Sequence, residues 1–206
     1  MPGNSPTVIV DYGMGNLRSV EKALAAVGGL PVISDAPAII RGCARLILPG
    51  VGAFGDAMEN LRRSGVEHAV REACEAGKPI LGLCLGLQLL FTLSEEFGSH
   101  RGLGMIPGKV RKFEEPGLRV PHVGWNQIES PSADPLLKGI PEGSYFYFVH
   151  SYYVEPEDSR DAIGWTSYGR RFCSIARRGK VWGAQFHPEK SQDAGKQLLR
   201  NFLSIS

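Results

Sequence analysis

The stretch KPILGLCLG, Lys78 to Gly86, decides the fold. Its first part, Lys78 to Leu83, is a short apolar run that predicts a buried strand, and Leu85 to Phe91 has the composition of a helix. The pattern Gly-x-Cys-x-Gly therefore falls where a strand turns into a helix. It is the thiol analogue of the Gly-x-Ser-x-Gly turn that presents a nucleophile above an α/β sheet.

Working outward from this turn, strand and helix patterns alternate along the first half of the chain. Such alternation is typical of βαβ units, which form an open, mostly parallel central sheet flanked by helices. After about Gly98 the pattern changes to short β-rich pieces, which predict extra antiparallel strands in the C-terminal half. The expected strands are Thr7–Val10, Pro31–Ile33, Arg45–Leu48, Phe146–Val149 and Val181–Phe186, and the expected helices are Leu17–Val27, Asp56–Ala76 and Ser191–Leu203.

The composition limits the class of protein. The chain has 206 residues, of which 43% are hydrophobic, and we expect residues 1–206 to form a single domain with a sizeable core. A net charge of only +2 argues against nucleic acid or a membrane surface as the main partner. The four cysteines include no Cys-x-x-Cys pair, and the N-terminus lacks a signal-peptide pattern, so we expect a cytoplasmic protein without a structural metal.

A glycine-rich loop, Leu48 to Asp56, follows the third expected strand. Its glycines at 50, 52 and 55 have the spacing Gly-x-Gly-x-x-Gly, but the next strand ends in Gly82-Leu83-Cys84 without the carboxylate that a dinucleotide site needs. A nucleotide site is therefore disfavoured. The loop is either a tight structural turn or a backbone that offers N–H groups to an anion, and the loop alone does not decide between them.

Cys84 is the candidate nucleophile. Flanking glycines let the turn tighten, and the positive end of the following helix favours the reactive thiolate. The N–H of Leu85 would point to where an oxyanion forms, and if the Leu48 strand adjoins the Leu83 strand, the N–H of Val51 would join it. The alternative for Cys84 is a small buried side chain, as we expect for Cys43, Cys74 and Cys173.

A nucleophilic cysteine needs a base and a group that orients the base. His187 ends the strand pattern and is followed by Pro188 and Glu189, whose carboxylate could curl back onto the imidazole. Taken alone, this segment favours a strand end with a surface acid. Together with the cysteine turn it favours a Cys84–His187–Glu189 triad, whereas His122 and His150 are left without an assigned role.

Six segments together resemble the triad glutaminases, the class I glutamine amidotransferases. The resemblance is strongest to the subfamily that supplies ammonia to a (β/α)8-barrel cyclase subunit in histidine biosynthesis. The matching segments run in order along nearly the whole chain: Asp11–Asn16, Leu48–Phe54, Gly82–Gln88, Pro121–Asn126, Tyr147–Tyr153 and Phe186–Ser191.

The resemblance implies an activity and its site residues. Cys84 would attack the carboxamide of L-glutamine, with no cofactor, and ammonia would pass to the cyclase, which makes imidazole glycerol phosphate and an aminoimidazole carboxamide ribotide. The substrate-binding residues would be Gly50, Gly52, Gln88, Ser151 and Tyr152. The residues facing the cyclase in the heterodimer would be Asn16, Pro121, His122, Trp125 and Asn126.

One departure from most triad glutaminases concerns the oxyanion loop. Most have two adjacent glycines there, whereas this chain has Gly50-Val51-Gly52, as in the subfamily. This leads to the hypothesis that the loop is inactive until the barrel subunit and its ligand bind. Three alternatives stay open: the glutaminase subunit of pyridoxal-phosphate synthase, a free-standing cysteine peptidase or γ-glutamyl hydrolase, and a catalytically silent binding subunit.

Overall fold

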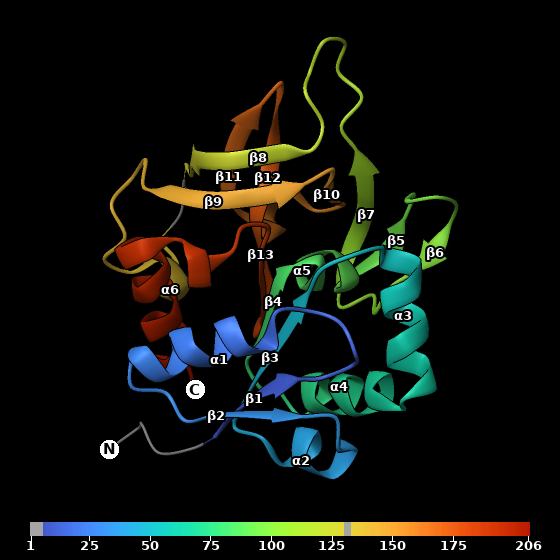
Figure 1. Cartoon of the computed structure of the whole chain (residues 1–206), viewed down its shortest axis with the longest axis vertical. Helices are drawn as coiled ribbons and strands as arrows, with labels where there is room; N and C mark the ends of the chain where they lie inside the picture. The colour runs from blue at the N-terminus through green and yellow to red at the C-terminus, as the bar shows by residue number, and fades with distance from the viewer. Residues whose placement is uncertain (1–5, 130–132) are drawn as a thin grey trace.

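The computed structural model describes residues 6–129 and 133–206. Four strands of the N-terminal half and β13 from near the C-terminus form the parallel part of the sheet, in the order β2-β1-β3-β4-β13, with every neighbouring pair parallel. The predicted open, mostly parallel sheet flanked by helices is confirmed (Figure 1). The strands are β1 (Thr7–Val10), β2 (Pro31–Ser34), β3 (Arg45–Gly50), β4 (Ile80–Cys84) and β13 (Val181–Ala184).

Helices cover both faces of these strands because apolar side chains alternate between the faces. On β1, Val8 and Val10 pack into one core and Ile9 into the other. The first core is closed by α2 (Pro37–Gly42), α3 (Phe54–Arg63), α4 (Val66–Glu75) and α5 (Leu85–Leu89). The second is closed by α1 (Leu17–Ala26) and α6 (Gln192–Ser204). Among the residues that the structure describes, no helix is long and apolar enough to cross a membrane.

Two expected helices differ from the structure. The single helix predicted over Asp56–Ala76 is wrong, because the chain forms α3 and α4 with a break at Gly65, which adopts a left-handed φ of 74°. The helix expected over Leu85–Phe91 ends at Leu89, and Phe91 begins a strand instead. Pairing of Phe91 with Ile106 in a neighbouring strand overrides the local helical preference there.

The C-terminal half extends the sheet with mostly antiparallel pairs, as predicted. The order continues from β13 through β12, β10, β7 and β5 to β6, and β11 pairs with β12. These strands are β5 (Phe91–Ser94), β6 (His100–Arg101), β7 (Ile106–Lys112), β10 (Tyr152–Pro156), β11 (Ala162–Tyr168) and β12 (Arg170–Arg178). Short 3-10 turns connect parts of this half, at η1 (Pro135–Leu137), η2 (Ser159–Asp161) and η3 (Pro188–Lys190).

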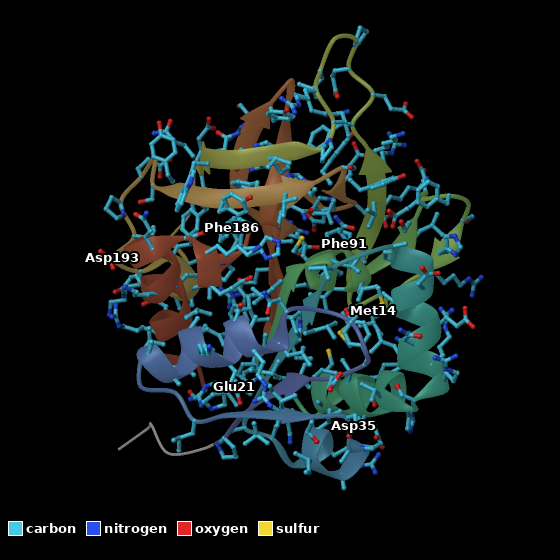
Figure 2. The ribbon with its side chains drawn as sticks, in the orientation of Figure 1. Met14, Glu21, Asp35, Phe91, Phe186 and Asp193 are labelled. Carbon is cyan, nitrogen blue, oxygen red and sulfur yellow. The ribbon has the colours of Figure 1, made fainter. Side chains whose placement is uncertain are left out.

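A separate two-stranded ribbon, β8 (His122–Gln127) with β9 (Tyr145–His150), lies across one end of the large sheet (Figure 1). Its inner face carries Phe146, Phe148 and the buried rings of His122 and His150, and Phe146 packs on Phe186 with ring centroids 4.1 Å apart. Figure 2 shows Phe186 inside the molecule beneath β9, whereas Asp193 points outward from α6. This packing holds the β8–β9 ribbon against the segment that follows β13. His187 comes directly after Phe186 in that segment.

Candidate active site

Cys84 lies at a strained turn between β4 and α5. Its φ is 54°, a left-handed value that is uncommon for a residue with a side chain. The turn closes tightly because Gly86 lies against β3, where an added Cβ would overlap the Leu48 carbonyl oxygen. This geometry matches the strained nucleophile turn that the Gly-x-Cys-x-Gly pattern predicts.

The glycine loop lies beside this turn. Strands β3 and β4 pair in parallel, with Gly50 in register with Cys84, so the adjacency expected from the sequence is present. The hydroxyl of buried Tyr12 donates to the Pro49 carbonyl oxygen at 2.8 Å and anchors the start of the loop. Gly52 adopts a φ of 99°, which a side chain at this position would disfavour.

His187 and Glu189 come together at the end of β13. Nδ1 of His187 lies 2.8 Å from Oε1 of Glu189, and the two side chains are only 6% and 3% exposed. The backbone N–H of His187 donates to the Tyr147 carbonyl at 2.9 Å. Ser191 strengthens this turn, since its hydroxyl donates to the His187 carbonyl at 2.6 Å and accepts from the Tyr147 N–H at 3.0 Å.

The electrostatics of His187 favour its charged form. Burial alone would lower the pKa of His187, but its interactions with Cys84 and then Glu189 outweigh burial and raise the pKa to about 10. Among the described residues, none makes a hydrogen bond to the buried Nε2 of His187, so this nitrogen is unoccupied beside the cavity. A protonated imidazole beside Cys84 stabilises a thiolate.

One cavity of about 550 Å³ gathers these residues. Most of the predicted site residues line it: Val51, Gly52, Cys84, Leu85, Gln88, Pro121, Ser151, Tyr152 and His187. Gly50 lies one residue before the lining, and Glu189 stands behind His187. Sequence reasoning missed five further lining residues, which are Glu96, Phe97, Lys112, Val149 and His150.

Glu96 is a buried carboxylate in this cavity, 8% exposed. Its Oε2 accepts the N–H of Phe54 at 2.6 Å. Burial raises the pKa of Glu96, and the Phe54 hydrogen bond opposes that change. The sequence offered no periodic or motif signal for this residue, because its role depends on β5 joining the sheet next to β7.

Two glutamines connect the Tyr152 carbonyl to the sulfur of Cys84. Nε2 of Gln88 donates to the Tyr152 carbonyl at 3.0 Å and to Oε1 of Gln185 at 3.2 Å. Nε2 of Gln185 lies 3.9 Å from Sγ of Cys84. The sequence pointed to Gln88 but not to Gln185, which is completely buried at the end of β13.

The residues expected to face a partner separate into two groups. Asn16 and Trp125 are exposed, Trp125 to 46%, and the loop before Asn16 adjoins Gly50. His122 is buried, only 3% exposed, so the expectation that its side chain faces a partner needs correction. It contacts Asn126 and Tyr168, which are both partly exposed.

All four cysteines are free, and only Cys84 lines the cavity. Burial raises the pKa of both Cys43 and Cys173, which keeps these thiols protonated and unreactive. Within residues 6–129 and 133–206 no cluster of three His, Cys, Asp or Glu side chains could hold a metal ion. A cysteine and a carboxylate-paired histidine on one cavity are suited to thiolate chemistry with a histidine as acid and base.

Comparison with known proteins agrees with this geometry. The family model for class-I glutamine amidotransferases matches residues 8–205. Imidazole glycerol phosphate synthase subunit HisH of Syntrophotalea carbinolica is 50% identical over 201 residues, covering 95% of this chain and 98% of the relative. The HisH subunit of Moorella thermoacetica is 50% identical over 197 residues, covering 96% and 93%.

Solved structures support the fold. PurLQS from Thermotoga maritima superposes with a TM-score of 0.77 at 19% identity, covering 97% of each chain. A glutamine amidotransferase crystal structure gives 0.75 at 23% identity, covering 95% of this chain and 96% of that one. The resemblance found in the sequence motifs is confirmed: the chain belongs to the class-I glutamine amidotransferases, in the group of the HisH subunits of imidazole glycerol phosphate synthase.

Proposed function

We propose that this chain hydrolyses L-glutamine to glutamate and ammonia with Cys84 as nucleophile, His187 as acid and base, and Glu189 as the orienting group. The observation that carries the proposal is the convergence of Cys84 and His187 on one cavity, with Glu189 2.8 Å behind the imidazole. The raised pKa of His187 supports a resting thiolate–imidazolium pair.

In the first half of the reaction the Cys84 thiolate attacks the side-chain carboxamide carbon of glutamine. The carbonyl electrons move to oxygen and form a tetrahedral oxyanion. The imidazolium of His187 gives its proton to the nitrogen, the C–N bond breaks, and ammonia leaves. What remains is a γ-glutamyl thioester on Cys84 and a neutral His187 that Glu189 still holds in its Nδ1–H tautomer.

In the second half water replaces ammonia. Neutral His187 takes a proton from water, and the hydroxide attacks the thioester carbonyl. The C–S bond then breaks, glutamate leaves, and the thiolate–imidazolium pair is restored. In both halves of the reaction the proton is carried by the same ring nitrogen of His187. One histidine held in a fixed orientation therefore serves both steps.

The oxyanion would be bound by the backbone N–H groups of Leu85 and Val51. Leu85 begins α5 directly after Cys84, and its N–H lies among those that have no partner within a helix. Val51 follows Gly50, which is in register with Cys84. One such donor contributes about 3 kcal/mol of transition-state stabilisation.

The amino-acid end of glutamine would be bound on the opposite side of the cavity. Both Nε2 hydrogens of Gln88 are engaged, and these two hydrogen bonds fix the orientation of the amide. The Oε1 atom is then the part of the amide that is available to accept from the substrate ammonium. The Glu96 carboxylate and the Lys112 ammonium line the same cavity and match the two charges of a free amino acid. Ser151 and Tyr152 complete this side, and a cavity of about 550 Å³ has room for one glutamine.

The partner in this proposal is the (β/α)8-barrel cyclase subunit of imidazole glycerol phosphate synthase, in a cytoplasmic heterodimer. Relatives that are about half identical to this chain carry the name of that synthase. Large apolar side chains are also exposed around the cavity mouth and along the β8–β9 ribbon, as expected of a docking surface. They are Val51, Phe97, Val123, Trp125 and Val149.

Glutamate release from glutamine tests the proposal, measured with the purified chain alone and with the cyclase subunit plus its ribulosyl ligand. We expect strong activation in the complex, which would also support gating by the Gly50-Val51-Gly52 loop. Full activity of the chain alone would contradict the gating and favour a free-standing hydrolase.

The pyridoxal-phosphate synthase alternative is set aside, because curated HisH relatives match across 95% and 96% of the chain.

A further inference from the structure

Two histidines without a role in the mechanism, His122 and His150, face each other across the β8–β9 ribbon. They are paired in register and are 3% and 6% exposed. Nδ1 of His150 lies 2.8 Å from the Tyr152 carbonyl oxygen, and Nδ1 of His122 lies 2.9 Å from Nε2 of His150. Since a carbonyl only accepts, His150 carries its proton on Nδ1, and its Nε2 accepts from Nδ1–H of His122.

The ribbon end of this chain of hydrogen bonds is also fixed. Nδ2 of Asn126 donates to Nε2 of His122 at 3.2 Å and to the Ser167 carbonyl at 3.0 Å. The His122 ring is stacked between Phe148 and Tyr168, at centroid distances of 4.9 and 4.0 Å. Burial lowers the pKa of His122 to about 4 and that of His150 to about 3, so both imidazoles stay neutral and neither acts as an acid near neutral pH.

The other end of the chain reaches the glutamine site. The Tyr152 carbonyl accepts from His150 and from Gln88, which occupies both of its lone pairs. The second Nε2 hydrogen of Gln88 goes to Gln185, whose own amide nitrogen faces the Cys84 sulfur. Each amide is thereby left with a single orientation.

We propose that His122 and His150 are positioning residues for glutamine hydrolysis, which hold the Tyr152 carbonyl where it orients Gln88 and, through Gln185, the amide facing Cys84. The inference deepens the proposed function and rests on it. Buried imidazoles cost desolvation that apolar side chains of similar size would avoid. In His122 and His150 every ring nitrogen has a hydrogen-bond partner, and this chain of hydrogen bonds ends at site residues. Ordinary core side chains have no such connection.

Steady-state kinetics of the cyclase complex test this role. His150→Leu removes the donor to Tyr152, and we expect the KM for glutamine to rise about tenfold, with a smaller fall in kcat. In His150→Asn the amide nitrogen can take the place of Nδ1, so we expect most of the loss to be restored. Phe202→Leu, at a fully buried position in α6 that does not line the cavity, is the control for lost packing and should leave KM unchanged.

A second variant, His122→Phe, tests the same inference if His150→Leu does not fold. His122→Phe keeps the stack between Phe148 and Tyr168 but leaves His150 without its donor, and we expect a KM rise of about threefold. Long-range ¹H–¹⁵N spectra of histidine-labelled protein report the tautomers directly. Two histidines should remain neutral Nδ1–H tautomers from pH 8 to about pH 5.

Three results would overturn the inference: Nε2–H tautomers for this pair, equal KM values for His150→Leu and His150→Asn, or the same rise in KM in Phe202→Leu. A wild-type complex that releases no glutamate would overturn the proposed function instead. The inference would then be decided by the rate at which iodoacetamide alkylates Cys84. His150→Leu should change that rate by at least about threefold and His150→Asn should not.

Discussion

The two sides of the cavity are built in different ways. Cys84 and the Gly50–Gly52 loop stand at the ends of parallel strands β3 and β4, which are buried along their whole length. The opposite side, from Val149 to Tyr152, comes from the end of the β8–β9 ribbon and the turn into β10. Val149 is 36% exposed there, and the ribbon carries further exposed apolar side chains.

The difference indicates that the two sides of the cavity have different roles. The strand side holds Cys84, the proposed nucleophile, in a strained turn with a single geometry, because a packed core surrounds it. The ribbon side provides the proposed substrate contacts and the proposed docking surface. The two sides meet at only a few polar points, above all Ser191 and the Tyr152 carbonyl. Changes on the strand side should therefore abolish chemistry, whereas changes on the ribbon side should alter binding and alignment.

The largest effect is expected on the strand side, from Cys84→Ala. Without the sulfur no thioester forms, so glutamate release should fall by at least about 10³-fold while the circular dichroism spectrum and melting temperature stay the same. Cys74→Ala, at a half-buried cysteine in α4 outside the cavity, is the control and should retain activity. Unchanged glutamate release in Cys84→Ala would rule out the mechanism.

Glu189→Gln should lower kcat by about 10²- to 10⁴-fold, because the imidazole loses the carboxylate that fixes its tautomer and charge. The pH dependence of the activity shows in which direction Glu189 shifts the pKa of His187. In the wild type the raised pKa of His187 preserves the imidazolium up to about pH 10. Removing the negative charge lowers that pKa, so the basic limb of the residual activity should move to lower pH. A basic limb at the wild-type position would show that Glu189 does not act on His187.

On the ribbon side, Trp125→Asp should weaken binding of the cyclase subunit about 30-fold, as expected for a charge placed at an aromatic contact. Isothermal titration calorimetry with the cyclase measures the change in Kd. Val32→Asp is the control, since Val32 is 38% exposed on β2, far from the ribbon in Figure 1. Equal losses in both variants would contradict the proposed docking surface.

The smallest effect is expected where the two sides meet. Ser191→Ala removes the hydroxyl that links the Tyr147 N–H to the His187 carbonyl, and should cost about 1–2 kcal/mol of unfolding free energy and a few-fold in kcat. Urea denaturation and glutamate release measure the two quantities. Ser204→Ala removes an exposed hydroxyl at the far end of α6, the helix that follows Ser191, and is the control. A stability loss without any change in kcat would show that Ser191 supports the fold but not the alignment of His187.

The sequence predicted the strand side well and the ribbon side poorly. The Gly82–Gly86 turn follows from a short apolar run and its flanking glycines, which are local signals, whereas the pairing of β3 with β4 is only a condition in the sequence and is shown by the structure. The pairing of β10 with β7 and β12 joins segments distant in the chain, and no periodic pattern specified it. The same reason explains why Glu96 and Gln185 were missed, since each becomes part of the site only through long-range contacts.

The histidines illustrate the same limit at the level of single residues. His187 could be assigned because Pro188 and Glu189 adjoin it in the sequence. His122 and His150 are 28 residues apart, and their contact exists only because β8 and β9 pair in that register. Sequence motifs therefore identified the groups proposed to do the chemistry, whereas the groups that position them required the structure.

Covalent labelling with a diazoketone analogue of glutamine, followed by peptide mapping, tests the central claim most directly. The account predicts one label per chain on Cys84, protection by glutamine, and loss of glutamate release in proportion to labelling. The other three cysteines should stay unmodified, since none of them lines the cavity. Label on another residue, or full glutamate release by a chain labelled at Cys84, would contradict the account.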